Sequence, residues 1–235
     1  MATENLLLAA LPREVYKRIE NKMEEVELSS GNILNRPGET IEEVYFPLTC
    51  LISVTITMMD GGTVEAGVVG SREMVGINAF MGGHETTQTQ YIIQVPGNAV
   101  KMKAHLLLHE FDINKSLRDV MLKYTQAYIA QISQNVACNR THTIEKRMAR
   151  WLLESSDRLY SDELLLSHEF LSHMLGVRRS GITETAHILE KKGLIKCSRK
   201  KIKIVEQQGL KEAACECYGV IKEEYDRLLN FKLER

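Results

Sequence analysis

Two short helix patterns joined by a single glycine, near the C-terminal end of the chain, constrain the fold most. Ser167 stands where a side-chain oxygen can cap a helix over residues 168–175, and Gly176 then suits a left-handed turn. A second helix pattern covers residues 178–192, and Gly193 stands at its C-terminal end. This order predicts a helix-turn-helix.

Two alternating strand patterns follow the second helix. They cover residues 194–197 and 201–205, and Ser198-Arg199-Lys200 joins them. We expect these strands to form a basic β-hairpin, which makes the whole segment a winged helix-turn-helix.

Basic side chains gather in the same part of the chain. Residues 141–206 carry 13 basic and nine acidic side chains, whereas residues 1–140 carry 12 and 16. The net charge of the whole chain is −1, so the positive field is local. Such a segment suits phosphate binding, although a solvated basic surface is the commoner cause of a small excess.

The start of the second helix and the tip of the hairpin carry the residues expected to meet a ligand. The helix opens at Arg178 or Ser180, and a guanidinium there can read guanine in a DNA major groove. The tip residues Arg199, Lys200 and Lys201 suit a phosphate backbone. These features favour DNA binding. A winged helix that contacts only protein is the alternative, and salt-dependent binding to random duplexes distinguishes the two.

The N-terminal half is predicted to be mostly β-structure. After an amphipathic helix around residues 12–26, short strand patterns follow, separated by glycine and proline. They cover residues 44–46, 51–57, 63–69 and 90–95, and Asp60-Gly61-Gly62 predicts a hairpin turn. Short strands at this spacing predict a small antiparallel barrel or jelly roll.

A long helix pattern runs from residue 112 to about residue 139. Its apolar residues follow the a/d spacing of a coiled coil and are Ile113, Leu117, Val120, Tyr124 and Ala127. A second apolar face contains Met121, Tyr128 and Ile132. From the period alone, pairing with a second copy and packing on the chain's own barrel are equally well supported.

Other protein classes fit the sequence poorly. No stretch approaches the roughly 18 consecutive apolar residues of a membrane span, and the apolar run at residues 6–11 is too short for a secretory signal. Five scattered cysteines argue against a disulfide framework. We expect a cytoplasmic protein, and the absence of catalytic motifs predicts that it is not an enzyme.

The order of these parts resembles the Crp/Fnr family of transcriptional regulators over nearly the whole chain. The matching residues are Gly38-Glu39, Val44-Tyr45-Phe46-Pro47, Leu51-Ile52-Ser53, Asp60-Gly61, the stretch from Gly70 to Gly76, Phe170 through Arg179, and Leu189 through Ile195. The resemblance implies an α+β chain that binds a near-palindromic DNA site as a homodimer.

We divide the chain into four parts on this basis. Residues 1–111 are expected to form a cyclic-nucleotide-binding-like β-jelly-roll that acts as a sensor, and residues 112–140 a dimerisation helix. Residues 141–206 are expected to form the winged helix-turn-helix that binds double-stranded DNA, and residues 207–235 a C-terminal amphipathic helix. RNA polymerase is a candidate partner, and no membrane partner is expected.

In this family the first turns of the recognition helix touch base edges. The corresponding residues are Arg178, Arg179, Ser180, Thr183 and Glu184, and Arg179 falls where relatives carry a base-reading arginine. Ser180 replaces a common glutamate, and Glu184 stands where the cyclic-AMP receptor has an arginine. The target sequence should therefore differ.

The resemblance also says which effectors to expect. Ile77 follows Gly76 where cyclic-AMP-binding members have a glutamate, and Thr87, beside Gln88, replaces their phosphate-binding arginine. Cyclic AMP is therefore not expected, because a buried anion without a cation is costly. Arg72 and Glu73 lie near this pocket and could compensate, although residues at a strand end are more often solvated. The effector remains unknown.

Metal cofactors have weak support in the sequence. An Fnr-type iron–sulfur cluster is not expected, because no cysteine precedes Cys50. Cys215 and Cys217 form the one close pair, but residues two apart on a helix point to different sides. We therefore expect Cys217 to pack, Cys215 to be incidental and no metal site, whereas haem ligation by one histidine stays open.

Overall fold

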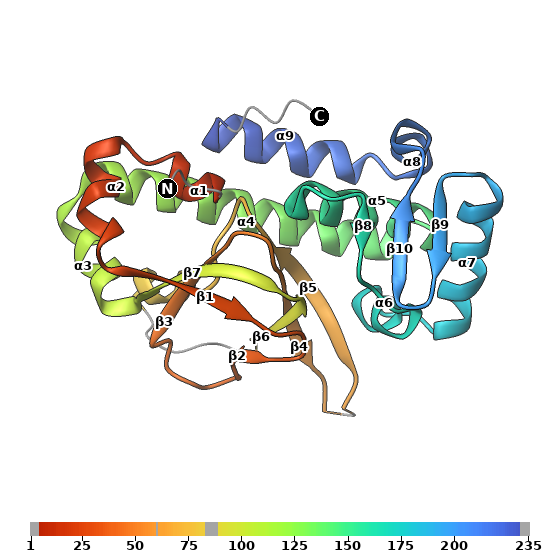
Figure 1. The fold of residues 1–235 in the computed structure, drawn as a ribbon, viewed down its shortest axis with the longest axis horizontal. Helices are drawn as coiled ribbons and strands as arrows, with labels where there is room; N and C mark the ends of the chain where they lie inside the picture. Colours follow the sequence, from red (N-terminus) through yellow and green to blue (C-terminus); the bar gives the residue numbers. More distant parts are fainter. Residues whose placement is uncertain (1–4, 60, 83–88, 231–235) are drawn as a thin grey trace.

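A β-roll, a long helix and a winged helix-turn-helix follow one another along the chain (Figure 1). The computed structural model describes residues 5–59, 61–82 and 89–230. The predicted α+β architecture is confirmed, with the roll below the long helix and the winged domain beside it.

Seven strands form the described part of the roll, in two antiparallel sheets. They are β1 (Met23–Leu28), β2 (Ile33–Asn35), β3 (Glu43–Pro47), β4 (Leu51–Thr57), β5 (Thr63–Val69), β6 (Thr89–Val95) and β7 (Gly97–Lys103). The sheet orders are β1-β7-β3 and β2-β6-β4-β5. The four predicted strands are confirmed as β3 to β6, whereas β1, β2 and β7 were not predicted.

The predicted helix over residues 12–26 is wrong in its second half. Helix α2 (Arg13–Glu20) ends early, and the chain enters β1 at Met23. In β1, Val26 pairs with Ala99 of β7 in a continuous antiparallel register. From Glu25 to Leu28 glutamates alternate with apolar residues, and this period of two suits a half-buried strand.

Short helices close the roll. They are α1 (Leu6–Ala9), the 3₁₀ helix η1 (Ile77–Phe80) and α3 (Ala104–Ile113). The predicted long helix begins at Lys115, not at residue 112, because Asn114 ends α3 and caps α4 (Lys115–Thr141) by accepting a hydrogen bond from the Leu117 amide.

The a/d residues predicted to pair with a second copy pack inside one protomer. Leu117, Tyr124 and Ala127 are fully buried, and the Tyr124 hydroxyl donates to the Met74 carbonyl at 2.6 Å. Ile113 belongs to α3, and Val120 is only partly buried against the roll core. The dimer assignment of the seam residues Leu117, Tyr124 and Ala127 is therefore corrected, because a buried side chain offers no surface to a partner. For Val120, which is only partly buried, the assignment stays a prediction.

The second half of the chain contains five helices and three short strands in its described part. They are α5 (Ile144–Leu159), β8 (Glu163–Leu164), α6 (His168–Met174), α7 (Arg179–Lys191), β9 (Ile195–Ser198), β10 (Lys201–Ile204), α8 (Gln207–Ala213) and α9 (Cys217–Leu229). Strand β8, which was not predicted, pairs with β10 to complete a sheet of order β8-β10-β9. Thr143 caps α5, since its hydroxyl accepts from the Lys146 amide.

The last helix runs back along α4, as Figure 1 shows. Ile221, Tyr225 and Leu229 of α9 belong to the apolar core of the roll. The predicted C-terminal amphipathic helix is not continuous, because residues 214–216 are outside regular structure and Ala214 is extended with a ψ of 165°. This break brings α9 onto α4.

The two halves of the molecule also share a core. Leu51, Val68 and Val95 of the roll pack in the same apolar cluster as Met148 and Leu152 of α5. No helix of residues 5–59, 61–82 and 89–230 has the length and apolar character to span a membrane.

Candidate nucleic-acid interface

The turn between α6 and α7 has the geometry that the sequence predicts. Ser167 caps α6 by accepting from the Phe170 amide at 3.1 Å. Gly176 has a φ of +60°, and Gly193, after α7, has a φ of +74°. Both glycines adopt the left-handed conformation that other residues take only at a cost, so the turn and the end of α7 are fixed locally.

Helix α7 is held by its apolar face. Ile182, Ala186 and Leu189 are no more than 1% exposed. The Arg147 guanidinium donates to the Leu175 carbonyl at the end of α6 and ties the turn to α5. These contacts leave one face of α7 to solvent.

The residues predicted to read bases all lie on that outward face. Arg178, Arg179, Ser180, Thr183 and Glu184 are exposed. The Thr183 hydroxyl donates to the Arg179 carbonyl at 3.1 Å and lies 3.2 Å from His168 Nδ1, so part of its hydrogen-bonding capacity is used within the domain. The first turn of α7 contains no acidic residue, which keeps its N-terminal end positive.

The wing presents a second set of cations. Strands β9 and β10 pair from Lys201↔Ser198 to Ile204↔Ile195, and Lys200 turns the chain with a φ of +58°. Arg199 and Lys200 are exposed at the tip, in agreement with the prediction.

Lys201 also forms an ion pair within the domain. Its ammonium group lies 2.5 Å from a Glu163 carboxylate oxygen on β8, and this hydrogen bond lowers the pKa of Glu163. Sequence reasoning did not include Lys196 and Lys203, which pair across the two strands and are both exposed. The alternation of polar and apolar residues along the wing strands could have predicted that Lys196 and Lys203 face solvent.

Arg72 and Glu73, two of the predicted effector residues, are buried between elements of the chain. Arg72 is 2% exposed and Glu73 is fully buried. The single N–H of Arg158 Nε is shared between the two Glu73 carboxylate oxygens, each at 3.0 Å. Arg72 lies 3.7 Å from Asp157 and 5.6 Å from the centre of the Tyr225 ring. The expectation that they are solvated at a strand end is wrong, because α5 and α9 cover them.

The remaining effector positions form part of the roll. Gly76 has a φ of +96°, and a Cβ there would lie 2.9 Å from Val44, so a larger residue does not fit. Ile77 opens η1 and is partly buried. Thr87 and Gln88 lie outside the described residues.

The cysteines near the end of the chain follow their predictions only in part. Cys215 is 4% exposed and Cys217 is 1% exposed, and both lie beside Cys138 at the end of α4. The prediction that Cys217 packs is confirmed, whereas the view that Cys215 is incidental is wrong, because Cys215 joins the same buried cluster. The assumption that failed is a continuous helix through residues 214–217.

The comparisons with known proteins agree with this geometry. Residues 146–213 match the family described as the Crp-like helix-turn-helix domain. No curated protein sequence matches the chain significantly.

Solved structures with the same fold are numerous. FixK2 from Bradyrhizobium japonicum is 16% identical with a TM-score of 0.71, and covers 82% of this chain and 98% of its own. A CRP/FNR-family transcriptional regulator from Thermus thermophilus is 20% identical with a TM-score of 0.65, covering 81% and 98%. The c-di-GMP-responsive regulator CLP from Xanthomonas campestris is 15% identical with a TM-score of 0.65, covering 82% and 99%.

The winged helix-turn-helix with its exposed second helix belongs to a class of domain that commonly binds DNA. Residues 146–213 thus match a Crp-like helix-turn-helix domain, and the described chain shares the fold of solved Crp/Fnr-family regulators.

Proposed function

We propose that this chain regulates transcription as a homodimer that reads a specific, near-palindromic DNA sequence through α7. The observation that carries the proposal is the exposed, basic start of α7 beside an exposed basic wing tip. An α-helix fits the B-DNA major groove, and its N-terminal residues reach the base edges in helix-turn-helix proteins.

Arg179 is the proposed base reader. It is exposed in the first turn of α7, and a guanidinium there can donate two hydrogen bonds to guanine O6 and N7. Arg178, Ser180, Thr183 and Glu184 would line the same groove. Glu184 brings an acceptor that suits the cytosine amino group, which supports a target different from one read by an arginine there.

The wing is proposed to contact phosphates. Arg199 and Lys200 at its tip, with Lys196 and Lys203 along its outer face, offer charges without the geometry for base reading. Lys201 contributes less in this proposal, because Glu163 already pairs with it.

The proposed dimer surface is the outer face of α4. Leu122, Ile129 and Val136 are 50%, 53% and 67% exposed. They stand seven residues apart along a helix of 27 residues, the heptad spacing of a coiled-coil seam. Pairing two copies of α4 through this face would cover the apolar row and relate two α7 helices by a two-fold axis.

The proposed sensor does not take cyclic AMP in the usual family mode. Support comes from Ile77, which offers no carboxylate to a ribose hydroxyl, and from Arg72, whose charge is engaged with Asp157 and Tyr225. We also infer that the chain is not an enzyme. A titration that shows tight, saturable cyclic-AMP binding would contradict the first inference.

Selection of bound DNA from a random pool, followed by footprinting, tests the proposed function. A palindromic motif with half-sites about one helical turn apart is the expected result. Binding of the selected site is then compared for the wild type, Arg179→Ala and Arg13→Ala, the last removing an exposed arginine on α2. Arg179→Ala should weaken specific binding by about 1–3 kcal/mol and leave non-specific binding nearly unchanged, whereas Arg13→Ala should change neither.

Two results would overturn this proposal. Equal losses on cognate and scrambled duplexes would remove Arg179 from base reading. The absence of any salt-dependent DNA binding would instead favour a winged helix that contacts protein.

A further inference from the structure

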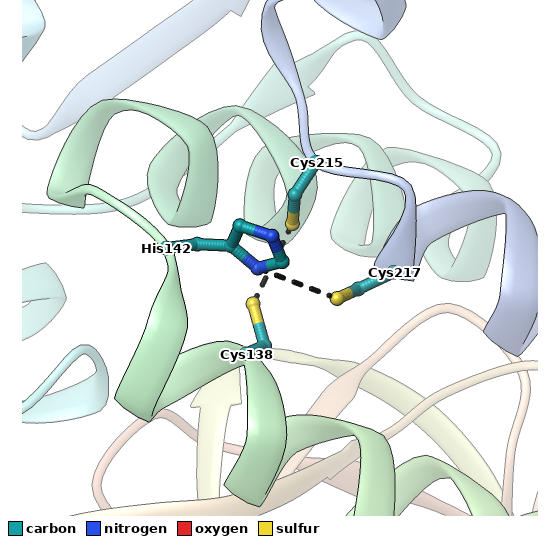
Figure 2. Close-up of side chains that lie close together, drawn as sticks. All are labelled: Cys138, His142, Cys215 and Cys217. Carbon is teal, nitrogen blue, oxygen red and sulfur yellow. Dashed lines mark hydrogen bonds between the residues drawn. The ribbon is translucent and has the colours of Figure 1, made fainter.

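Three cysteines and one histidine from distant parts of the sequence meet in one place. Cys138 lies near the end of α4, His142 in the link to α5, and Cys215 and Cys217 at the link between α8 and α9 (Figure 2). Their side chains point toward one another, and all four potential ligand atoms lie within 4.8 Å of each other.

Two of the six distances between the ligand atoms lie close to the edges of a small tetrahedron, and the others are no longer than 4.8 Å. Cys138 Sγ lies 3.5 Å from Cys215 Sγ, and Cys217 Sγ lies 3.6 Å from His142 Nδ1. Zinc bonds of about 2.3 Å to sulfur and about 2.0–2.1 Å to nitrogen give tetrahedral edges of roughly 3.8 Å between sulfurs and roughly 3.6 Å between sulfur and nitrogen. An ion at the centre would therefore need little movement of the side chains.

The hydrogen-bond partners around the four side chains suit ligation through His142 Nδ1. Its other ring nitrogen, Nε2, lies 3.2 Å from a Glu216 carboxylate oxygen. A carboxylate that accepts from the distal N–H fixes the tautomer and makes the ligating nitrogen more basic. Gln134 Nε2 lies 3.1 Å from Cys217 Sγ and donates to it, as expected beside a thiolate.

Burial and charge also suit a metal. Cys138, Cys215 and Cys217 form a buried cluster of their own, separate from the two large cores. Three thiolates and one Zn²⁺ would carry a net charge of −1. The nearby Arg150 guanidinium offsets negative charge at Cys138, and its Nε is buried without a hydrogen-bond partner.

The interrupted helix explains how both nearby cysteines can face one point. Residues 214–216 are not helical, and Cys217 is the first residue of α9. The break therefore removes the constraint that residues two apart on a helix point to different sides.

We propose that Cys138, His142, Cys215 and Cys217 bind one Zn²⁺ ion in a tetrahedral site. Three soft thiolates with one imidazole at this spacing favour zinc over magnesium or calcium, which prefer oxygen ligands. An iron–sulfur cluster places several iron atoms between its ligands and needs a wider cage.

The ion would join the end of α4 to the start of α9 at the connection between the roll and the winged domain. It would act as a structural staple there, because four protein ligands close the coordination sphere. This inference does not depend on the proposed DNA function, since metal binding is measured without DNA.

Cobalt substitution in the full-length protein tests the site. The reduced protein is stripped with a chelator, titrated with Co²⁺ and then with Zn²⁺. We expect one Co²⁺ per chain, an intense visible spectrum of tetrahedral cobalt, a thiolate-to-cobalt charge-transfer band in the near ultraviolet, and loss of both when Zn²⁺ displaces Co²⁺.

Two variants and one control localise the ion. Cys217→Ser should remove the charge-transfer intensity of one thiolate and weaken binding strongly. Glu216→Gln, at an exposed surface position, should lower the affinity about 10- to 100-fold while the spectrum keeps its form. Cys197→Ser changes a free cysteine on the wing and should bind like the wild type.

Several outcomes would overturn the proposal. These are no stoichiometric Co²⁺, a weak octahedral spectrum, an equal loss in Cys197→Ser, and a thiol count that reveals a Cys138–Cys215 disulfide in place of metal. If Cys217→Ser fails to fold, the wild-type stoichiometry and Glu216→Gln still decide the question.

Discussion

Replacing Arg158 by methionine should break the buried ion network that joins the roll to the winged domain. Arg158 lies on α5 and is fully buried. Its Nη2 lies 2.8 Å from Glu73 and donates to Gln131 at 3.0 Å, while its Nη1 donates to Glu154 at 3.3 Å. The neighbouring carboxylates raise the pKa of Arg158 against the effect of its burial, so the side chain is charged at any working pH.

The expected loss of stability in Arg158→Met follows from the carboxylate that the substitution leaves without its partner. Without Arg158, the buried Glu73 carboxylate keeps one described donor, the Gly70 amide at 2.6 Å. Removing one partner of a buried ion pair costs about 3–5 kcal/mol. This is a large part of a total stability of about 5–15 kcal/mol.

Urea unfolding at pH 7 and fixed protomer concentration measures the loss. With an m-value of about 3 kcal/mol per molar, the midpoint should fall by roughly 1–1.7 M. Arg13→Met, which changes an exposed arginine, should shift stability by less than about 0.5 kcal/mol.

A double-mutant cycle separates the ion pair from general packing. Glu73→Gln combined with Arg158→Met should cost less than the sum of the two single changes, by about 2 kcal/mol or more. A loss below about 1 kcal/mol for Arg158→Met, or strictly additive effects, would refute the assignment of this network as the main polar link between the domains.

Two further predictions concern the dimer face and a buried carboxylate. Ile129→Glu should convert the proposed dimer to a monomer in sedimentation equilibrium, because it places charge in the proposed seam. Ser116→Glu, exposed on the same helix, should not, and a dimer unchanged by Ile129→Glu would exclude this face. Burial raises the pKa of Glu65, whose oxygens accept from Ser53 and from Trp151 Nε1 at 2.8 Å. The folded state therefore favours the neutral acid, and wild-type stability falls as the pH rises above the ordinary carboxyl pKa of about 4.3. Glu65→Gln should gain stability over the wild type between pH 5 and pH 8 in urea unfolding, and a difference independent of pH would contradict the assignment.

The recognition helix could be predicted from sequence because its determinants are local. Ser167 caps its own helix, and Gly176 and Gly193 supply the left-handed residues within one stretch of chain. No distant residue is needed to set these conformations, so the candidate DNA-reading residues were found with their correct exposure.

The packing of α4 could not be derived in the same way. The a/d spacing of Leu117 and Tyr124 fits a partner helix as well as it fits the chain's own roll and α9. Only the tertiary fold shows that these residues are covered and that Leu122, Ile129 and Val136 are not.

The cysteine cluster was not predicted because it depends on two features of the tertiary fold. Cys138 and Cys215 are 77 residues apart, and their meeting requires α9 to return along α4. It also requires the helix break at residues 214–216, where no proline or glycine marks an end. Arg72 and Glu73 were misplaced for a similar reason, since α5 and α9 cover a strand end that would otherwise be solvated.

The return of α9 to the roll has a mechanical consequence. Because Ile221, Tyr225 and Leu229 belong to the core of the roll, the winged domain is attached to that core at both of its ends. The winged domain therefore resembles a domain inserted within another domain, with two connections to it, rather than a terminal domain joined by a single linker. Any rotation of α7 relative to α4 must move the connections on both sides of the winged domain together. The freedom of the DNA-binding surface is thus limited by chain connectivity as well as by the contacts between the domains.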